Sequence, residues 1–467
     1  MQELKVDQKE LEKRVKHVAS LSKEIPWYVR NYKELGIDPD KIRNPQDLLK
    51  AYEKGLYTTP QDLPELVYYE DKNTKEFYTS GTTRGPKRVG MNKDDEKRAI
   101  NQNIRLFQQA LKKSDRVLNC FPAPPAISGY WENCALSALG YTYVHLPAQE
   151  LRSNPNKFIE YYKEFKPTAL GGLTTFVYRL PLLLEGVGLC SKKLGITSIF
   201  TGGEASDISR RKEIGNEFEA KVYDLYGTSE SGLVAYELKP FTDEFNITLH
   251  ETLVFLIKNG EQIGVGEIGD VLLTNLYDPT LLKPYMVLLN YKIGDWAKCI
   301  EKENEYIITS IGEIRREITR TKLHPQEVEK AIEDLKEYKK KLSGEYTVID
   351  FQTIPREPIN KLIQQGVEID EKLLEKLRRN PEIYKNWDRK AESEIRIESR
   401  YNLQSEEKEE IGRKVREIIY SSNIPLKTLV EEIGEARLFI EIKDIGDLYK
   451  GFKKLIKPGK PKRFIGV

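Results

Sequence analysis

The chain has 467 residues, of which 32% are charged, but its formal net charge is only +2. This length predicts two or three structural units, and the balanced charge excludes an overall electrostatic attraction to nucleic acid or to an anionic membrane. The four cysteines are far apart and include no C-x-x-C pair, which argues against a zinc site or a disulfide framework.

In chain order, residues 1–55 predict helices interrupted by a turn at 36–40. A stretch rich in hydroxyl groups and glycine follows at 78–88, between an apolar-aromatic run at 66–69 and a helical pattern from about Lys93. No apolar run approaches the ~18 residues that span a bilayer, so we expect a soluble, cytoplasmic protein. The abundance of Lys, Glu and Ile, with only three Met, resembles thermophile usage.

The stretch 78–88, Tyr-Thr-Ser-Gly-Thr-Thr-Arg-Gly-Pro-Lys-Arg, has the composition of a phosphate-binding loop. Its glycines let backbone N–H groups approach an anion, its hydroxyls donate hydrogen bonds, and Lys87 or Arg88 supplies positive charge. It is not a Walker loop, because Pro86 stands where that motif needs its second glycine. The alternative is a basic surface turn without a ligand.

Helical and strand patterns alternate from about 95 to 240, which is typical of a parallel sheet flanked by helices. The predicted helices are 94–111, one from about 129, 156–165, 176–184 and 208–218, and the predicted strands are 116–120, 141–146, 168–172, 198–200 and 221–223. Glycine turns at 201–204 and 226–230 follow the last two strands. Because ligands bind beyond the carboxyl ends of such strands, we expect both turns to face one crevice.

Short alternating strands at 246–310 predict a β-rich subdomain that ends near Gly312, and a helix is predicted from His324. Residues 357–415 are strongly charged and helical in pattern. The predicted fold class is therefore α/β. A large N-terminal domain, 1–312, would combine parallel sheets flanked by helices with the β-rich subdomain, and a small mobile α+β domain would occupy 313–467.

Four segments in this order resemble the adenylate-forming superfamily of acyl-CoA synthetases and adenylation domains, most closely its phenylacetate-CoA ligase branch. They are Thr79-Ser80-Gly81-Thr82-Thr83 with Pro86-Lys87, then Gly202-Gly203-Glu204, then Asp224-Leu225-Tyr226-Gly227-Thr228-Ser229-Glu230, and Tyr291-Lys292-Ile293-Gly294-Asp295. Residues 28–39 and the helix start at His324 also resemble that branch. Each motif alone is weak, since a Tyr-Gly or Gly-Asp pair is more often a plain turn, but their order is specific.

The resemblance implies a role for each matching residue. Phosphate binding would involve Thr79, Ser80, Gly81, Thr82, Thr83 and Lys87, and the rest of the nucleotide would lie against Gly203, Glu204, Asp224, Tyr226 and Gly227. Tyr226 offers a flat face for adenine, and Ser229 a hydroxyl for the α-phosphate. Glu230 is a hard oxygen ligand for Mg²⁺, and Asp295 an acceptor for the ribose hydroxyls. The acid pocket would lie near Tyr130, Trp131, Gly202 and Ala205.

The resemblance also implies a mobile catalytic lysine near the C-terminus. Gly459-Lys460-Pro461-Lys462-Arg463 keeps the family's Gly-Lys-x-x-Arg spacing, which makes Lys460 the candidate. The alternative is a basic tail that is merely solvated.

The sequence departs from the family pattern at three places. Arg84 stands where glycine is usual, and Asn290 replaces the arginine expected before Tyr291. The family's Gly-Arg hinge is Gly312-Glu313 here, so a guanidinium contact to AMP would have to come from Arg315 or from the next residue, Arg316, and Arg315 is the candidate. The changes at Arg84 and at the hinge bear on the phosphate geometry and on the domain rotation by which relatives switch from adenylation to thioester formation.

Together the motifs imply ATP- and Mg²⁺-dependent activation of a carboxylic acid, most simply an aromatic one, to an acyl-adenylate, and then transfer to coenzyme A. One alternative is an adenylate-forming enzyme with another acceptor, either a carrier protein or a nucleotidyl acceptor as in deazaflavin-adenylating relatives. A non-catalytic nucleotide-binding protein is the third. We expect a small-molecule acid as partner and neither nucleic acid nor membrane, and a homodimer stays open.

Overall fold

The computed structural model describes residues 7–70, 72–78, 87–154, 156–204, 206, 208–316, 328, 331–332, 334–335, 338, 341–350, 393–399, 403–422, 438–443 and 464–466. The chain divides into two compact units. Unit 1 comprises 1–79, 87–204 and 208–316, and unit 2 comprises 317–467 with 80–86 and 205–207. In the described part, none of the helices combines the length and the apolar character needed to cross a membrane.

The predicted N-terminal helices are present, and their caps explain their boundaries. They are α1 (Gln8–Ser22), α2 (Pro26–Glu34), the 3₁₀ turn η1 (Pro39–Lys41) and α3 (Pro45–Glu53). Asp7 and Asn44 cap α1 and α3 by accepting hydrogen bonds from backbone N–H groups, and prolines occupy the first positions of α2 and α3. A second 3₁₀ turn, η2 (Leu63–Glu65), follows.

Strands β1 (Lys75–Tyr78) and β2 (Arg88–Met91) pair antiparallel, with Tyr78 opposite Arg88. They flank the candidate phosphate loop, of which residues 79–86 lie outside the described residues. Helix α4 (Lys93–Ala110) follows and begins in a capping box formed by Asn92 and Asp95.

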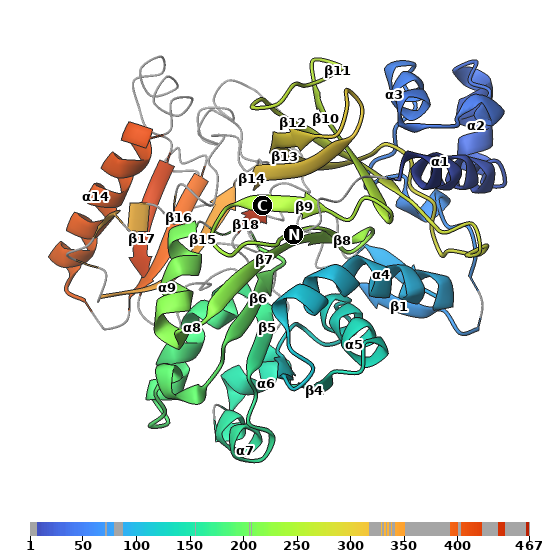
Figure 1. The fold of residues 1–467 in the computed structure, drawn as a ribbon. Coiled ribbons are helices and arrows are strands. Elements are labelled where there is room, and N and C mark those ends of the chain that lie inside the picture. The colour runs from blue at the N-terminus through green and yellow to red at the C-terminus, as the bar shows by residue number, and fades with distance from the viewer. Residues whose placement is uncertain are drawn as a thin grey trace, which may run out of the picture. The chain divides into compact units, whose positions relative to one another are not determined.

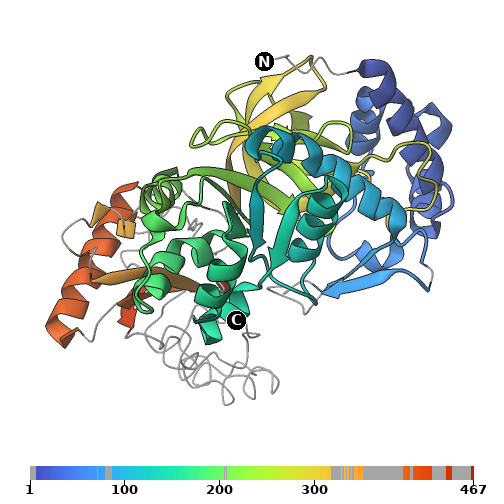
Figure 2. The same ribbon diagram turned by 60° about the horizontal axis from the view of Figure 1, so that its bottom comes forward.

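The alternating region folds as predicted into parallel strands connected by helices. The strands are β3 (Arg116–Asn119), β4 (Thr142–His145), β5 (Ala169–Leu173), β6 (Ser198–Gly202) and β7 (Lys221–Thr228). The connections contain α5 (Ser128–Ala138), α6 (Ala148–Ser153), α7 (Asn156–Phe165), α8 (Thr174–Glu185), η3 (Ser191–Leu194) and α9 (Ile208–Phe218). Figures 1 and 2 show α4 and α5 on one face of these strands and α8 and α9 on the other. The connection from β3 to β4, which contains α5, and the connections from β5 through β6 to β7, which contain α8 and α9, run in opposite directions along the sheet, and the right-handed rule for such crossovers places their helices on opposite faces.

The β-rich segment continues the same sheet. It contains β8 (Gly232–Glu237), β9 (Glu244–Ile247), β10 (Thr252–Lys258), β11 (Glu261–Gln262), β12 (Ile268–Asn275), β13 (Tyr291–Lys302) and β14 (Ile308–Arg316). Among the described residues, one twelve-stranded sheet runs in the order β11-β10-β12-β13-β14-β9-β8-β7-β6-β5-β3-β4. The domain boundary expected after Gly312 falls inside β14.

One local prediction is wrong. Residues 226–228 are not a turn but the end of β7, which pairs antiparallel with β8, and the hairpin turn lies at 229–231. Glycine at position 227 allows the backbones of β7 and β8 to approach closely, because a Cβ at this position would lie 2.6 Å from the carbonyl oxygen of Gly232.

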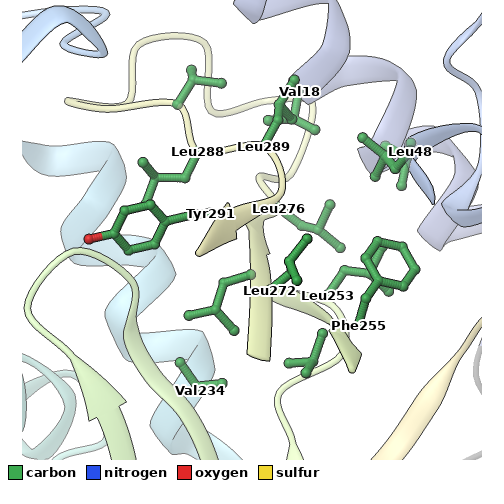
Figure 3. Packing of buried hydrophobic residues seen from close by; sticks show 14 of the residues in the cluster. Val18, Leu48, Val234, Leu253, Phe255, Leu272, Leu276, Leu288, Leu289 and Tyr291 are labelled. Atoms are coloured by element: carbon green, nitrogen blue, oxygen red, sulfur yellow. The ribbon is translucent and has the colours of Figure 1, made fainter. Parts of the chain in front are cut away.

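Two large hydrophobic clusters and one small one hold the described part of unit 1 together. One large cluster joins helices α1–α3 to the antiparallel strands, and Figure 3 shows part of it, with Val18 and Leu48 from the helices beside Leu253 and Leu272 from the sheet. The other large cluster lies around the parallel strands and includes Leu106, Phe176 and Phe200.

The described part of unit 2 contains a four-stranded sheet and a helix. The sheet order is β17 (Leu438–Lys443), β16 (Ser393–Ser399), β15 (Leu342–Asp350) and β18 (Phe464–Gly466), and α14 (Ser405–Ser422) contributes Ile411, Val415 and Ile419 to the core. The helical prediction for 357–415 is wrong at β16. There Ile395 and Ile397 lie two positions apart on one face of the strand and are buried, and Arg396 between them is buried as well. Residues 324–327 of the other predicted helix lie outside the described residues.

Candidate active site

The two motif segments that follow β6 and β7 lie at one edge of the sheet. These strands are parallel neighbours, with Gly202 opposite Leu225, so their carboxyl ends meet. A Cβ on Gly202 would come within 2.7 Å of the Leu225 carbonyl oxygen, and Gly203 has a φ of +74°. Both positions therefore require glycine.

Glu204 turns its carboxylate back toward the protein. Its Oε2 accepts hydrogen bonds from the backbone N of Thr175 at 3.0 Å and from its hydroxyl at 2.7 Å, at the N-terminus of α8. A negative charge at a helix N-terminus is stabilised by the unpaired N–H groups there. The side chain therefore fixes the course of 202–204 and leaves the backbone to meet a ligand.

Tyr226 and Asp295, which are 69 positions apart, meet through their side chains. The Tyr226 hydroxyl at the end of β7 donates to Asp295 Oδ2 at 2.9 Å, and Asp295 follows Gly294, whose φ is +86°. Both side chains are half-buried. An aromatic face and a carboxylate held in this way can receive a base and a diol.

Glu230 lies in the hairpin turn and is bound by two elements distant in sequence. Its Oε1 accepts a hydrogen bond from the Tyr291 hydroxyl at 3.0 Å, and Lys87 Nζ lies 3.3 Å from the same oxygen. The Glu230 side chain is 7% exposed and that of Lys87 is 32% exposed. Among the described residues, Oε2 has no hydrogen-bond partner. Figure 3 shows the Tyr291 hydroxyl pointing away from the labelled leucines.

Of the two cations that follow the candidate loop, Lys87 contacts Glu230, whereas Arg88 is paired elsewhere. Arg88 pairs with Glu76, at 2.7 Å, and with Glu70. Ser229, which precedes Glu230 in the turn, is half-buried. The backbone of the turn is closed by a hydrogen bond from Ser231 N to Thr228 Oγ1 at 3.0 Å.

Asp224 is occupied by protein groups. Its Oδ1 accepts from Thr201 Oγ1 at 3.0 Å, and Arg211 Nη1 lies 3.1 Å from Oδ2. Burial raises the pKa of Asp224 to about 7 although Arg211 opposes this shift. The geometry therefore favours a supporting role under the Tyr226 segment over direct ligand contact.

Arg211 is fully buried and bridges three carboxylates. Besides Asp224, its Nη2 lies 3.3 Å from Glu237 Oε1 and 3.1 Å from Asp243 Oδ1. Asp243 Oδ2 in turn accepts from the backbone N of Glu313 at 3.2 Å. A continuous polar network thus runs from β7 to β14.

Two of the three departures from the family pattern, Glu313 and Asn290, lie in the described part of the chain, whereas Arg84 lies outside it. Glu313 has a φ of +44°, and its carboxylate pairs with Lys298 at 2.9 Å. Arg315 lies opposite Trp296 in the β13–β14 ladder, and its side chain lies outside what the structure describes. Asn290, with a φ of +49°, donates through Nδ2 to the carbonyls of Leu48 and Leu56 at 2.9 and 3.1 Å, which ties the N-terminal helices to the sheet.

Tyr130 and Trp131, predicted for the acid pocket, lie on α5. The Tyr130 hydroxyl donates to Glu96 Oε1 at 2.5 Å and accepts from Lys75 Nζ, and its ring lies 5.3 Å from that of Phe77. Burial and the hydrogen bond to Glu96 raise the pKa of this phenol. Trp131 is half-buried against the small apolar cluster that contains Phe77, Val89 and Met91.

The remaining predicted site residues lie outside the described residues. They are Thr79, Ser80, Gly81, Thr82, Thr83, Ala205 and Lys460. Within the described ranges, no three His, Cys, Asp or Glu side chains are grouped to hold a metal ion. Sequence reasoning did not assign roles to the Tyr291 hydroxyl or to Arg211. The position of Tyr291 in the last motif was the available signal for the first, whereas a helical arginine gave none.

Comparisons with known proteins follow the same lines. Residues 51–273 match the model of a family described as AMP-binding enzyme. The phenylacetate-coenzyme A ligases of Thermus thermophilus and Escherichia coli are each 24% identical to the chain, over 61% and 59% of its length. A crystal structure of 2-hydroxyisobutyryl-CoA ligase in the postadenylation state, in complex with 2-HIB-AMP, has a TM-score of 0.70 at 14% identity, covering 98% of this chain and 89% of that one.

The sequence matches span 64% and 63% of the two relatives' own lengths. The fold match, in contrast, extends over nearly the whole chain. The predicted resemblance to adenylate-forming enzymes and the predicted α/β fold class are thus confirmed.

Proposed function

We propose that this protein is an AMP-forming acid–thiol ligase. It would join a carboxylic acid to ATP as an acyl-adenylate with release of pyrophosphate, and then pass the acyl group to coenzyme A. We propose an aromatic acid as substrate, because the two sequence relatives are named phenylacetate-coenzyme A ligases and because Tyr130 and Trp131, which we propose for the acid pocket, are aromatic side chains packed against the cluster that contains Phe77.

The observation that carries the proposal is the arrangement around Glu230. A nearly buried carboxylate is held at Oε1 by Lys87 and Tyr291, while Oε2 has no hydrogen-bond partner in the described part of the chain and could bind a ligand. This fits Mg²⁺, which is typically bound by one or two carboxylates together with substrate phosphates, so that no larger protein cluster is needed. Mg²⁺ bound there would neutralise charge on the phosphates.

The other residues serve the nucleotide and the acid. Tyr226 would stack on adenine and Asp295 would accept from the ribose hydroxyls, since their mutual hydrogen bond already fixes both side chains. Lys87 would exchange its contact with Glu230 for phosphate oxygens, and Ser229 would donate to the α-phosphate. Residues 79–83 would bind the phosphates of ATP. Residues 313–467 would form a small domain that carries the catalytic lysine, Lys460.

The chemistry proceeds in two steps. A carboxylate oxygen of the acid attacks the α-phosphorus of ATP, the bond to pyrophosphate breaks, and Lys460 would offset the repulsion between the two anions. The sulfur of coenzyme A, having lost its proton, then attacks the acyl carbon, and AMP leaves with the electron pair of the broken bond.

The four cysteines are unpaired, which fits the reducing cytoplasm we propose.

A second candidate differs in the acceptor. The hinge arginine of the family pattern is Glu313 here, and its carboxylate pairs with Lys298, so this residue supplies neither a guanidinium contact to AMP nor the usual hinge for a domain rotation. An adenylate-forming enzyme that delivers to a carrier protein or to a nucleotidyl acceptor would tolerate this change.

Acid-dependent exchange of labelled pyrophosphate into ATP tests the proposal. We expect exchange with at least one member of a panel of aryl and fatty acids, and thioester formation when coenzyme A is added. Exchange without thioester would favour the second candidate. Absence of exchange with every acid, in a protein shown to be folded, would refute adenylate formation.

A further inference from the structure

Asn275, the last residue of β12, connects the Glu230 turn to the helix α4. Its Nδ2 donates to the backbone carbonyl of Glu230 at 3.2 Å, and its Oδ1 accepts from Arg98 Nη2 at 3.0 Å. Asn275 is 1% exposed and Arg98 is 5% exposed. One buried amide thus joins three elements that are far apart in the sequence.

Arg98 is a rigid support for this amide. Its Nε and Nη2 donate to the Glu251 carbonyl at 3.0 and 2.8 Å, and Nη2 also donates to Thr252 Oγ1 at 3.0 Å. Its guanidinium carbon lies 5.3 Å from the centre of the Tyr277 ring. Because an arginine can only donate, the amide must turn its oxygen toward Arg98 and its NH₂ toward Glu230.

The other supports of the turn act on different atoms. Ser231 N donates to Thr228 Oγ1, and Gln102 Nε2 donates to the Ser231 carbonyl at 2.8 Å. Among the described residues, the donor to the Glu230 carbonyl is Asn275. A charged donor on Oδ1 also polarises the amide and strengthens the N–H that points at Glu230.

We propose that Asn275 is a positioning residue that sets the main chain of Glu230 so that its carboxylate meets the metal–nucleotide complex. The inference rests on the proposed function, in which Glu230 binds that complex. Groups behind a metal ligand fix its direction, and a change in one such partner commonly weakens binding by about 10- to 100-fold. Asn275 does not contact the carboxylate itself but acts through the main chain of Glu230. Losing it should therefore weaken metal binding by the net free energy of one hydrogen bond, which corresponds to about 3- to 10-fold in affinity.

The test uses Mn²⁺ with ATP as the probe and the full chain as the protein. The Asn275→Asp variant keeps the acceptor for Arg98 but removes the donor to Glu230. Binding of Mn²⁺ in the presence of ATP is measured by electron paramagnetic resonance, which reads metal binding without turnover. We expect affinity for Mn²⁺ to fall about 3- to 10-fold. Asn275→Ser, which is too short to bridge both partners, serves as the second variant should the first not fold.

Thr252→Val is the control, because it removes an acceptor that Arg98 shares with a long 3.4 Å contact from Gln102, and it leaves both the amide of Asn275 and the bond from Gln102 to the Ser231 carbonyl in place. It should lower the melting temperature without changing Mn²⁺ affinity. If wild type and the folded Asn275 variants bind Mn²⁺ with equal affinity, the inference is overturned and the proposed function stands. The same holds if Thr252→Val loses as much Mn²⁺ affinity as the Asn275 variants do. If the wild-type protein does not bind Mn²⁺ with ATP, the proposed function itself fails and the inference with it.

Discussion

Replacing Glu230 by glutamine probes the proposed site with the smallest change of shape. The amide keeps an oxygen that can accept from Tyr291, whose hydroxyl lies 3.0 Å from Oε1, and it removes the charge that faces Lys87 at 3.3 Å. Loss of a positioned charge where charge develops in the transition state typically costs ~10²–10³ in rate. We therefore expect acid-dependent pyrophosphate exchange to fall by about that factor.

The fold should tolerate this change. Lys87 is 32% exposed, so its ammonium stays partly hydrated when its partner becomes neutral, and we expect the free energy of unfolding to change by about 1 kcal/mol or less. Urea denaturation measures this quantity beside the exchange assay. A matched control is Glu65→Gln, which neutralises the exposed partner of Arg30 and should leave exchange unchanged. Exchange within a few-fold of wild type in Glu230→Gln would refute the assignment.

Three further predictions concern Asp224, Asn290 and Lys460. Folding raises the pKa of Asp224 from 3.8 to about 7, so the folded state binds a proton that the unfolded state releases, and the free energy of unfolding should fall as pH rises from about 4 to about 7. Asp224→Asn should flatten that slope in urea denaturation. Asn290→Ala should destabilise by about 2–3 kcal/mol in the same assay, because two buried carbonyls lose their donor and alanine disfavours the left-handed backbone. Lys460→Ala should lose ~10²–10³ in adenylation but still convert synthetic acyl-adenylate and coenzyme A to thioester.

Each of these has a control in the chain. Asn259→Ala places alanine at an exposed position with a φ of 54° and isolates the backbone part of the Asn290 effect. If both variants lose the same stability, the hydrogen bonds of Asn290 contribute nothing measurable. Lys462→Ala is the control for Lys460→Ala. If Lys460→Ala loses adenylation and thioester formation equally, Lys460 does not act in one step only. An unchanged pH slope in Asp224→Asn would mean that other groups hold the proton.

Much of unit 1 could be predicted because its signals are local. The capping asparagine before α3, the prolines that open α2 and α3, and the alternation of apolar runs with glycine turns from 95 to 240 depend on neighbours within a few residues. The end of β7 was mistaken for a turn because Tyr226-Gly227 has turn composition. Its extended backbone depends on pairing with β8.

The sequence by itself determined the order of motifs, the parallel half of the sheet and the chemical types at the candidate site, because periodicity and residue type are properties of short segments. Only the tertiary structure decided which groups meet. Glu230 with Lys87 and Tyr291, Tyr226 with Asp295, and Asn275 with Arg98 are contacts between segments 61 to 177 positions apart. Such contacts arise where strands of the large sheet meet one another, the end of the β1–β2 hairpin or the helix α4, and no local pattern encodes which of these elements become neighbours.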